Sequence, residues 1–523
     1  MNIRRWFCCG LLLGLVSALH ADPSEKVTAW NDAPLGFHWD RLGPQPAPVD
    51  LAAYPAVRHV SGRTGSDETG DGSRAKPWRS VRKALTPAPE GARVAVLVAE
   101  GLYQEETLVL QPRVDLYGGY EAKGWTRDFA AHPAILSGGG QRRVLVGAND
   151  CRLDGFVVED GLVRDHGAGL YCSQAAPVVV NNVFRRNRTL EPADFPHQDA
   201  RRRIRGHDGG AIALVNYANA DIRHNIFHDN ETGVGYGGAV AARDDCIPVI
   251  AHNVFWGNRA GTTDRKKTLS GNGGAVALLF SSRAAVFHNL FAENDAQGGS
   301  DGGALFCEYF SWPEVRHNAF LNNHAGDDGG GMDNQKFSYP KVKANLFYGN
   351  RADGSGGAFH LDDAVVELEN NVIAYNHAKK QAGGLGGTHG WYRALNNTIA
   401  YNVAGQDGGG VHIVNVKNPF LRPPVYRNNL IAHNQPDQVL MEGDLDVTYN
   451  IMHPGGFKGG YYNFDHDPKF ADDSRTLAVR GVRRDPATLS SELQVDAADA
   501  AGSLVGRIAR IGDFWTMVKA NGA

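Results

Sequence analysis

One hexapeptide, Asn-x-[Phe/Ile]-x-x-Asn, occurs nine times between residues 182 and 434, and this repeat limits the folds that the chain can adopt. Its copies begin at Asn182, Asn225, Asn253, Asn289, Asn318, Asn345, Asn371, Asn397 and Asn429. A pair of glycines usually precedes the copy at a fixed distance, as Gly210 precedes Asn225 by fifteen residues. The distance from each copy to the next glycine pair varies widely. Each repeat therefore has one part of fixed length and one loop of free length.

The fixed part of the repeat has the alternation of short β-strands. The segment 275–280, for example, reads Ala-Val-Ala-Leu-Leu-Phe and has no helical period. A unit of 26 to 29 residues cannot bury its own apolar face, so the units must stack on one another. Parallel stacking repeats about every 4.8 Å. We therefore expect the nine asparagines to form one longitudinal row that satisfies turn backbone, with the paired Phe or Ile residues inside.

The sequence outside the repeat carries further motifs of one known family. They include Gly70-Asp-Gly-Ser73, Pro77-Trp-Arg-Ser-Val81, Leu116-Tyr-Gly-Gly-Tyr120 and Asp465-His-Asp-Pro-Lys-Phe470. Over about residues 55 to 470 the chain resembles the bacterial right-handed β-helix repeat proteins of the pectin-lyase-like fold. It is similar, in particular, to the Gly-Gly-Ala and Phe-x-x-Asn repeats of polymorphic outer-membrane proteins. The resemblance implies an all-β, right-handed, single-stranded parallel β-helix solenoid with capped ends.

The two ends of the chain lack the repeat. Arg4 and Arg5, the apolar run 8–19 and Ala21 have the pattern of a secretory signal peptide, and the run is too short to span a bilayer. We expect a signal peptide at 1–21, an N-terminal extension at 22–54, a cap and first coils at 55–165, repeat coils at 166–470 and a C-terminal cap or tail at 471–523. Residues 497–520 are expected to form a helix over the last coil. The predicted location is secreted (periplasmic, extracellular or cell surface), without a transmembrane anchor.

Charge and cysteine content exclude several classes of protein. A formal charge of −4 and a pI near 6.6 argue against nucleic acid and anionic membranes as partners. Removal of the signal would leave Cys151, Cys172, Cys246 and Cys307, whose spacing fits neither a zinc site nor a dense disulfide framework. Cys172 and Cys307 fall in one inward column about four coils apart. We therefore expect these two to be buried free thiols.

Alignment on the glycine pairs assigns side chains to the two faces of one sheet. The inward column is Leu170, Ile212, Val240, Val276, Leu305, Met332, Phe359, Leu385 and Val411. The next residue of each strand should point outward, which gives Tyr171, Ala213, Ala241, Ala277, Phe306, Asp333, His360, Gly386 and His412. A second outward column contains Ser173, Val215, Arg243, Leu279, Glu308, Gln335, Asp362, Thr388 and Val414. Ionisable groups are concentrated in the middle and late coils.

The resemblance implies where chemistry would lie, because related lyases and hydrolases use this face with a groove walled by loops and often a calcium ion. The catalytic candidates are Asp333, His360 and Asp362, with partial burial expected. Candidates for substrate binding are Glu308, Tyr309, Lys336, His389, His412 and Arg243. Two carboxylates roughly 8 Å apart suit a hydrolase, whereas a lyase needs a base such as Lys336 or His360. Calcium is the one cofactor that the resemblance implies.

Two functions from different classes remain open. One is a polysaccharide lyase, glycoside hydrolase or binding protein that acts as a monomer on a polysaccharide or cell-surface glycan, preferably an acidic one because of Arg201-Arg-Arg-Ile-Arg205. The other is a non-catalytic surface or adhesion scaffold. Candidate sugar-stacking aromatics are Tyr309, Phe310, Trp312, Tyr339 and Trp391. Phe310 also aligns with Phe337 of the next repeat, so these two rings are alternatively expected to stack on each other. Asp208, Asp301, Asp328 and Asp407, which precede glycine pairs, are expected to shape turns.

Overall fold

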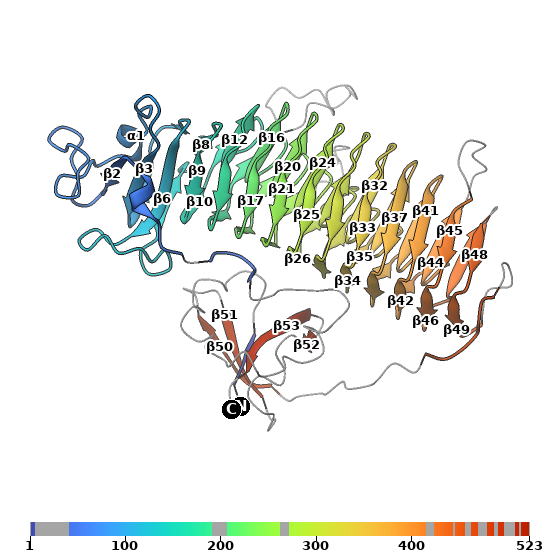
Figure 1. The fold of residues 1–523 in the computed structure, drawn as a ribbon. Helices are drawn as coiled ribbons and strands as arrows, with labels where there is room; N and C mark the ends of the chain where they lie inside the picture. The colour runs from blue at the N-terminus through green and yellow to red at the C-terminus, as the bar shows by residue number, and fades with distance from the viewer. Residues whose placement is uncertain are drawn as a thin grey trace. The chain divides into compact units, whose positions relative to one another are not determined.

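The computed structural model describes residues 41–45, 47–190, 207–261, 271–414, 423–442, 445–455 and 462–468, and the backbone of 2–5, 479–485, 490–495, 508–511 and 514–521. By their internal contacts the residues divide into an Arg41–Ala285 unit and a unit of Val286–Ala523 with Met1–Asp40. Each unit is described here by itself. In both, short strands follow one another along the chain and pair in parallel with their equivalents in the next coil (Figure 1).

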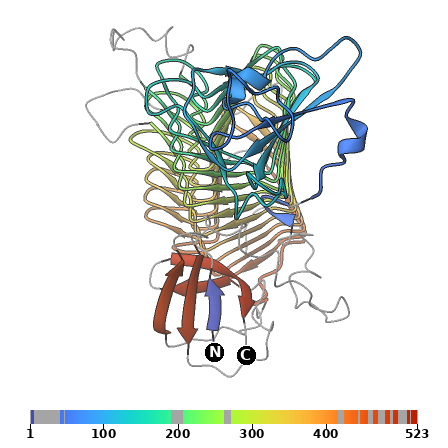
Figure 2. The same ribbon diagram turned by 90° about the vertical axis from the view of Figure 1, so that its left-hand side faces the viewer.

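The Arg41–Ala285 unit contains four rows of parallel strands, which Figure 2 shows turned by 90° about the vertical axis. The first row is β2 (Ala56–Val60), β3 (Val94–Ala99), β6 (Val114–Tyr120), β9 (Arg152–Asp154), β13 (Val178–Val180), β17 (Asp221–Arg223) and β21 (Val249–Ala251). The second is β4 (Gly101–Tyr103), β7 (Ala134–Ser137), β10 (Phe156–Glu159), β14 (Val183–Arg185), β18 (Ile226–His228) and β22 (Val254–Trp256). The third is β5 (Leu108–Val109), β8 (Leu145–Val146), β12 (Leu170–Ser173), β16 (Ile212–Val215), β20 (Val240–Arg243) and β24 (Val276–Leu279). The fourth is β11 (Leu162–Val163), β15 (Arg188–Thr189), β19 (Glu231–Thr232) and β23 (Arg259–Ala260).

The Val286–Ala523 unit repeats the same four rows. The first is β29 (Glu314–Arg316), β33 (Lys341–Lys343), β37 (Val365–Glu369), β41 (Trp391–Leu395), β45 (Val425–Arg427) and β48 (Asp446–Thr448), and β25 (Ala285–Phe287) lies at the division. The second is β26 (Leu290–Ala292), β30 (Ala319–Leu321), β34 (Leu346–Tyr348), β38 (Val372–Ala374), β42 (Thr398–Ala400), β46 (Leu430–Ala432) and β49 (Ile451–His453). The third is β28 (Leu305–Cys307), β32 (Met332–Gln335), β36 (Phe359–Asp362), β40 (Leu385–Thr388), β44 (Val411–Val414) and β47 (Val439–Glu442). The fourth is β27 (Asp295–Ala296), β31 (His324–Ala325), β35 (Arg351–Ala352), β39 (His377–Ala378) and β43 (Val403–Ala404).

The expected asparagine row is confirmed within each unit. The backbone N–H of Asn182 donates to Oδ1 of Asn225 at 2.9 Å, and Asn225 donates in the same way to Asn253. In the other unit the row runs through Asn289, Asn318, Asn345, Asn371, Asn397 and Asn429 to Asn450. The last asparagine of each hexapeptide forms a second row of the same kind, as Asn350 and Asn376 do at 2.9 Å. These residues are buried and structural, as the sequence predicts.

The apolar partners of the asparagines form the core. Phe184, Phe227 and Phe255 stack at centroid distances of 5.1 and 4.8 Å, and Phe320 and Phe347 stack at 4.5 Å. The inward column that begins with Leu170 is wholly buried, so its assignment is confirmed. Cys172 and Cys307 are buried and free, as expected, and so are Cys151 and Cys246.

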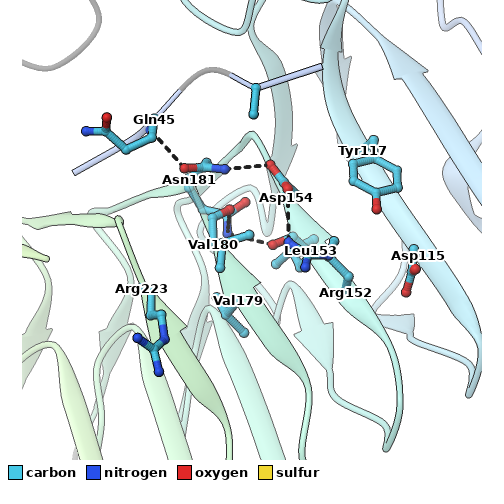
Figure 3. A network of polar contacts seen from close by, with 12 residues as sticks. Gln45, Asp115, Tyr117, Arg152, Leu153, Asp154, Val179, Val180, Asn181 and Arg223 are labelled. Carbon is cyan, nitrogen blue, oxygen red and sulfur yellow. Dashed lines mark hydrogen bonds and ion pairs between the residues drawn. The ribbon is translucent and has the colours of Figure 1, made fainter. Parts of the chain in front are cut away.

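The N-terminal part of the Arg41–Ala285 unit combines a short helix with an extended segment. Helix α1 (Val81–Ala84) is preceded by the N-cap Ser80, and the 3₁₀ turn Leu51–Ala53 is capped by the Asp50 side chain. The extended segment, residues 41–45, contacts the coils through its backbone. Gln45 N–H donates to Oδ1 of Asn181 at 2.9 Å, and Asn181 Nδ2 donates to Oδ1 of Asp154 at 3.0 Å (Figure 3). This segment is therefore hydrogen-bonded to the outer turns of the coils.

The C-terminal residues form strands where the sequence predicts a helix. Strands β50 (Val479–Asp485), β51 (Ser490–Val495), β52 (Ile508–Ile511) and β53 (Phe514–Asn521) join β1 (Asn2–Arg5) in a sheet of order β50-β51-β1-β53-β52. The predicted helix at 497–520 is therefore wrong. Ile508–Ile511 and Phe514–Asn521 pair as an antiparallel hairpin, and β-branched and aromatic residues in 514–518 favour strands. Within the described part of the chain, no helix has the length and hydropathy needed to cross a bilayer.

Candidate functional site

Most of the residues predicted for the site lie where β28, β32, β36 and β40 end. Strand register places Phe306, Asp333, His360 and Gly386 in one column, with Gln335, Asp362 and Thr388 two residues further along. Glu308 follows directly after β28. The turns after these strands carry another row of side chains. We call the following residues the β28–β40 corner: Glu308, Tyr309, Phe310, Gln335, Lys336, Phe337, Asp362, Asp363, Thr388 and His389. The sequence therefore predicts the registers of these columns correctly.

Asp333 and His360 form a buried pair. Nδ1 of His360 lies 2.9 Å from Oδ1 of Asp333, which confirms that the two can share a proton. Asp333 is fully buried and His360 is 5% exposed, so the expectation of partial burial is wrong for both and holds for Asp362. The glycine turn that precedes each strand folds back over the outward residue. A Cβ at Gly329 or Gly356 would lie 2.6 or 2.7 Å from the Cβ of Asp333 or His360, and both glycines have a φ of +70°.

Burial and neighbouring carboxylates shift the pKa values of this pair. Burial alone would lower the pKa of His360, but the hydrogen bond from Asp333 and the charges of Asp328, Asp333 and Asp301 raise it to about 9. Burial raises the pKa of Asp333, against the effect of His360. Burial and the charge of Asp333 likewise raise the pKa of Asp301 well above its usual range. Since His360 stays protonated at neutral pH, it cannot act as a base there.

Gln335, a residue of the corner, hydrogen-bonds to the buried Asp333. Its Nε2 donates to Oδ2 of Asp333 at 2.8 Å and to Oδ2 of Asp301 at 3.0 Å. The Asp328 backbone N–H donates to Oδ1 of Asp301 at 3.1 Å, and Asp328 Oδ1 accepts from Ser355 N–H at 2.5 Å. These bonds bear out the expected turn-forming role of Asp301 and Asp328.

Glu308 is a carboxyl group of the corner whose pKa lies near neutral pH. It is 8% exposed, and its pKa is raised to about 7, chiefly by burial. The charge of Lys336 lowers this pKa, and the charge of Asp333 raises it. A carboxyl group with such a pKa exists in both protonation states near neutral pH and can donate or accept a proton. The sequence analysis assigns Glu308 only to substrate binding, because register alone does not reveal how deeply a side chain is buried.

Lys336 and Asp362 form the principal ion pair of the corner. Nζ of Lys336 lies 3.1 Å from Oδ2 of Asp362 and 3.9 Å from Oδ2 of Asp363, and Nδ1 of His389 lies 3.9 Å from Oδ1 of Asp362. Burial tends to lower the pKa of Lys336, but its hydrogen bond with Asp362 and the nearby carboxylates raise it overall. Lys336 is therefore held protonated and, like His360, is a poor base. Asp363 is a member of this cluster that the sequence analysis missed, although it directly follows Asp362.

Among the residues that the structure describes, two groups of side chains have ligand atoms close enough for a cation. One is Asp362, Asp363 and His389, and the other is Asp301, Asp327 and Asp328. Calcium prefers six to eight oxygen ligands, about 2.3–2.6 Å away. The first group fits calcium poorly, because it offers a nitrogen ligand and Asp362 is paired with Lys336. The second group offers three carboxylates, although Asp327 lies 3.4 Å from Nζ of Lys380.

Exposed aromatic rings lie in the turns that follow β28 and β32. Phe310 and Phe337 stack at a centroid distance of 5.5 Å, which bears out their alignment in the sequence. Their exposed fractions are 52% and 64%, and Trp312 is 54% exposed. Tyr339 instead donates from its hydroxyl to Oε1 of Glu367 at 2.5 Å, and Trp391 Nε1 donates to the carbonyl of Pro423 at 3.2 Å.

The remaining predicted residues lie away from the ion pair. His412 is in the column of His360 with Gly386 between them, and burial lowers its pKa. Arg243 belongs to the Arg41–Ala285 unit, where its Nη1 lies 2.7 Å from Oδ2 of the buried Asp208. The arginine loop 201–205 lies outside the described residues.

Comparisons with known proteins agree with this architecture. Residues 63–275 match the model of family DUF1565, described as a protein of unknown function. No curated protein sequence matches the chain. Among solved structures, XylC in complex with xylose is 13% identical with a TM-score of 0.44, and the match covers 81% of this chain and 87% of that chain. A mutant of the periplasmic alginate epimerase AlgG is 10% identical, with a TM-score of 0.36 and coverage of 71% and 77%.

A mannuronic acid specific polysaccharide family 6 lyase from human gut microbiota is 11% identical, with a TM-score of 0.36 and coverage of 73% and 87%. Because the identities are 13% or less and the TM-scores are below 0.5, these likenesses do not assign an activity to this chain. The parallel registers, the asparagine rows and the stacked phenylalanines carry the assignment. The chain is an all-β parallel β-helix protein.

Proposed function

We propose that this protein binds and processes a polysaccharide at the β28–β40 corner, and that it does so as a glycoside hydrolase. The observation that carries the proposal is the placement of Glu308 directly after β28 and of Asp362 at the end of β36, with the coil of Gln335 between them. Two coils separate their backbones by about 10 Å, and the carboxyl groups of inverting glycosidases are roughly 6.5–9.5 Å apart. Glu308 would be the general acid, and Asp362 would activate the water.

The proton affinities favour a hydrolase over a lyase. A lyase must remove a proton from the carbon next to a uronate carboxylate, which requires an unprotonated base. Lys336 and His360, the bases predicted for that reaction, are both held protonated by neighbouring carboxylates. Glu308 has the pKa of about 7 that an acid catalyst needs. Asp333 and His360 are too buried to contact a substrate, so their role would be to position Gln335 between the two carboxyl groups.

The exposed rings next to the carboxyl groups supply the usual surface for a sugar. Phe310, Trp312 and Phe337 are each more than half exposed. Aromatic faces of this kind pack against the apolar C–H faces of sugar rings. The expected preference for an acidic polymer rested on 201–205, so the described geometry does not support it.

Export is a separate part of the proposal. Arg4 and Arg5 followed by the apolar run 8–19 and Ala21 have the order of a cleaved signal, which would deliver the protein to polysaccharides outside the cytoplasm. We expect the mature protein to act as a monomer on free or cell-surface glycans.

The test uses the full-length protein and a panel of neutral and uronate polysaccharides, followed by reducing ends and by the absorbance of unsaturated products. We expect new reducing ends without unsaturated products, and inversion of the anomeric configuration in the first product seen by NMR. Glu308→Gln and Asp362→Asn should each lower kcat by about 100-fold or more. Glu314→Gln, an exposed carboxylate on β29, is the matched control and should leave kcat unchanged.

Deprotonation of Glu308 should make kcat fall as the pH rises through about 7. Unsaturated products would show a lyase and refute the assignment of roles. Binding without any product would favour the non-catalytic scaffold.

A further inference from the structure

One face of the Phe337 ring is left open by a difference between adjacent coils. Gln335 pairs with Asp362 and Lys341 with Glu367, so five residues on one coil oppose four on the next. The shorter coil places Asp363 against this turn, where its carbonyl accepts from the Phe337 N–H at 2.7 Å. Phe310 stacks on Phe337 from the preceding coil, but the following coil has no aromatic residue at the matching position. Phe337 is therefore stacked on one side only and is 64% exposed.

The surface next to this ring is acidic. Asp362 and Asp363 belong to the corner, and Asp301, Asp327 and Asp328 lie in the glycine turns that precede β28 and β32. Gln335 joins the two groups, because its Nε2 donates to Asp301. The nearby lysines are Lys336 and Lys380, which lie 3.1 Å from Asp362 and 3.4 Å from Asp327. Their charges are thus already offset by carboxylates of the chain itself.

An incoming carboxylate would be repelled here. Polyanions bind to proteins that present cations in excess of anions, and clefts lined by one sign of charge exclude ligands of the same sign. Beside Phe337 the described charges are the carboxylates of Asp362 and Asp363 against the single ammonium group of Lys336. An uncharged sugar pays no such cost, and it can stack on Phe337 and hydrogen-bond to the aspartates through its hydroxyls.

We propose that the β28–β40 corner takes an uncharged glycan, with one sugar ring stacked on the open face of Phe337, and that its aspartates exclude polyuronates. The proposal rests on the function proposed above and defines its substrate class. Phe337 is then the residue that positions the sugar, and Asp363 is the residue that selects against a carboxylate.

The experiment compares polymers that differ only in the carboxyl group. Polymers of mannuronate, galacturonate and glucuronate are each tested beside their carboxyl-reduced forms, in which every uronate has become a neutral hexose of the same linkage. Binding to the full-length protein is measured by affinity electrophoresis or calorimetry at low and high salt. We expect at least one reduced polymer to bind ten or more times tighter than its parent, and the difference to shrink as salt screens the repulsion.

Two variants assign the effect to residues. Phe337→Ala should weaken binding of the reduced polymer at least tenfold, whereas Tyr217→Ala should not. Tyr217 is a matched control, because it is 62% exposed in the same left-handed turn conformation of the Arg41–Ala285 unit. Asp363→Asn should improve binding of the parent polyuronate and leave the reduced polymer unaffected. Asn suits this position, because Asp363 has a φ of +49° and Asn tolerates that conformation.

The two proposals fail in different ways. Equal or tighter binding of a polyuronate than of its reduced form would overturn the substrate class and leave the hydrolase proposal standing. Unchanged binding in Phe337→Ala would overturn the stacking position. No binding or cleavage of any polymer would overturn the proposed function itself.

Discussion

Asp333 and His360 show what a sequence reveals about single residues and what it does not. Both follow a glycine pair at the same distance, so their pairing across adjacent coils can be predicted from alignment alone. Their burial cannot, because it depends on how the preceding turn folds back over the strand. Gly329 and Gly356 make that close approach through a φ that residues with a Cβ rarely adopt. The burial of Glu308 could not be predicted either, because register does not reveal how deeply a side chain lies.

The His360 pair predicts how stability depends on pH. The pKa of His360 rises from 6.5 to about 9 on folding, so its protonated form stabilises the fold fully below pH 6.5 and loses this effect as the pH rises through 9. The raised pKa of Asp333 acts in the same direction. We expect the melting temperature to fall between pH 6.5 and 9.5, and to fall less in His360→Gln. Thermal unfolding by circular dichroism measures both slopes, and equal slopes would contradict the assignment.

The stacked phenylalanines predict how much the free energy of unfolding falls when a core side chain is shortened. Phe347 is fully buried and packs 4.5 Å from Phe320. Phe347→Ala should lower the free energy of unfolding by about 3–5 kcal/mol, because it removes buried apolar surface and leaves a cavity. Tyr375→Ala is the control, since that ring is 44% exposed and should cost far less. Urea unfolding monitored by tryptophan fluorescence compares the two, and similar midpoints would place Phe347 outside the core.

At the scale of the element, the repeating unit is the coil, and the side-chain amides of asparagines join adjacent coils by hydrogen bonds. Asn345 Nδ2 donates to the carbonyls of Val315 and Lys343 and to Oδ1 of Asn371. Its own Oδ1 accepts from the Asn318 N–H. The hexapeptide predicts this row because identical residues recur at identical positions in the coil. The loop lengths between copies carry no such constraint, so the loops could not be predicted.

Removing one asparagine should therefore affect two neighbouring coils. Asn345→Ala leaves the Asn318 N–H and the Val315 carbonyl buried without these partners, at about 1–3 kcal/mol for each unsatisfied group. We expect the free energy of unfolding to fall by at least about 2 kcal/mol. Hydrogen exchange should show faster exchange of the Asn318 amide, while amides several coils away keep their protection. Uniform loss of protection across the unit would contradict a local role.

At the scale of the whole molecule, repetition explains why most of the fold could be predicted and the ends could not. Each repeat must stack on its neighbours to bury its apolar face, so nine copies of one motif define a parallel β-helix. The terminal segments have no such copies, and composition alone suggested a helix at 497–520. These residues form strands instead, because β53 pairs with both β52 and β1. Such antiparallel pairing between the two ends of a chain leaves no periodic signal in the sequence.

The last prediction follows from the position of β1 in that sheet. Strand β1 lies between β51 and β53, yet Asn2–Arg5 are also the basic start of the expected signal peptide. If the chain is exported and cleaved after Ala21, the mature protein loses β1, and the hairpins β50–β51 and β52–β53 lose the strand that joins them. We expect mass spectrometry of the protein purified from the periplasm or medium to show a mature N-terminus at or near Asp22.

A matched pair of proteins separates the two roles of this segment. Residues 22–523 and residues 1–523, both produced in the cytoplasm, differ only in the presence of β1 and the apolar run. Because the coils have their own asparagine rows and core, we expect the two to unfold with the same main transition. Limited proteolysis should cut the region after residue 478 faster in the shorter protein. An exported protein that keeps Met1 would instead show that β1 is a permanent part of the C-terminal sheet.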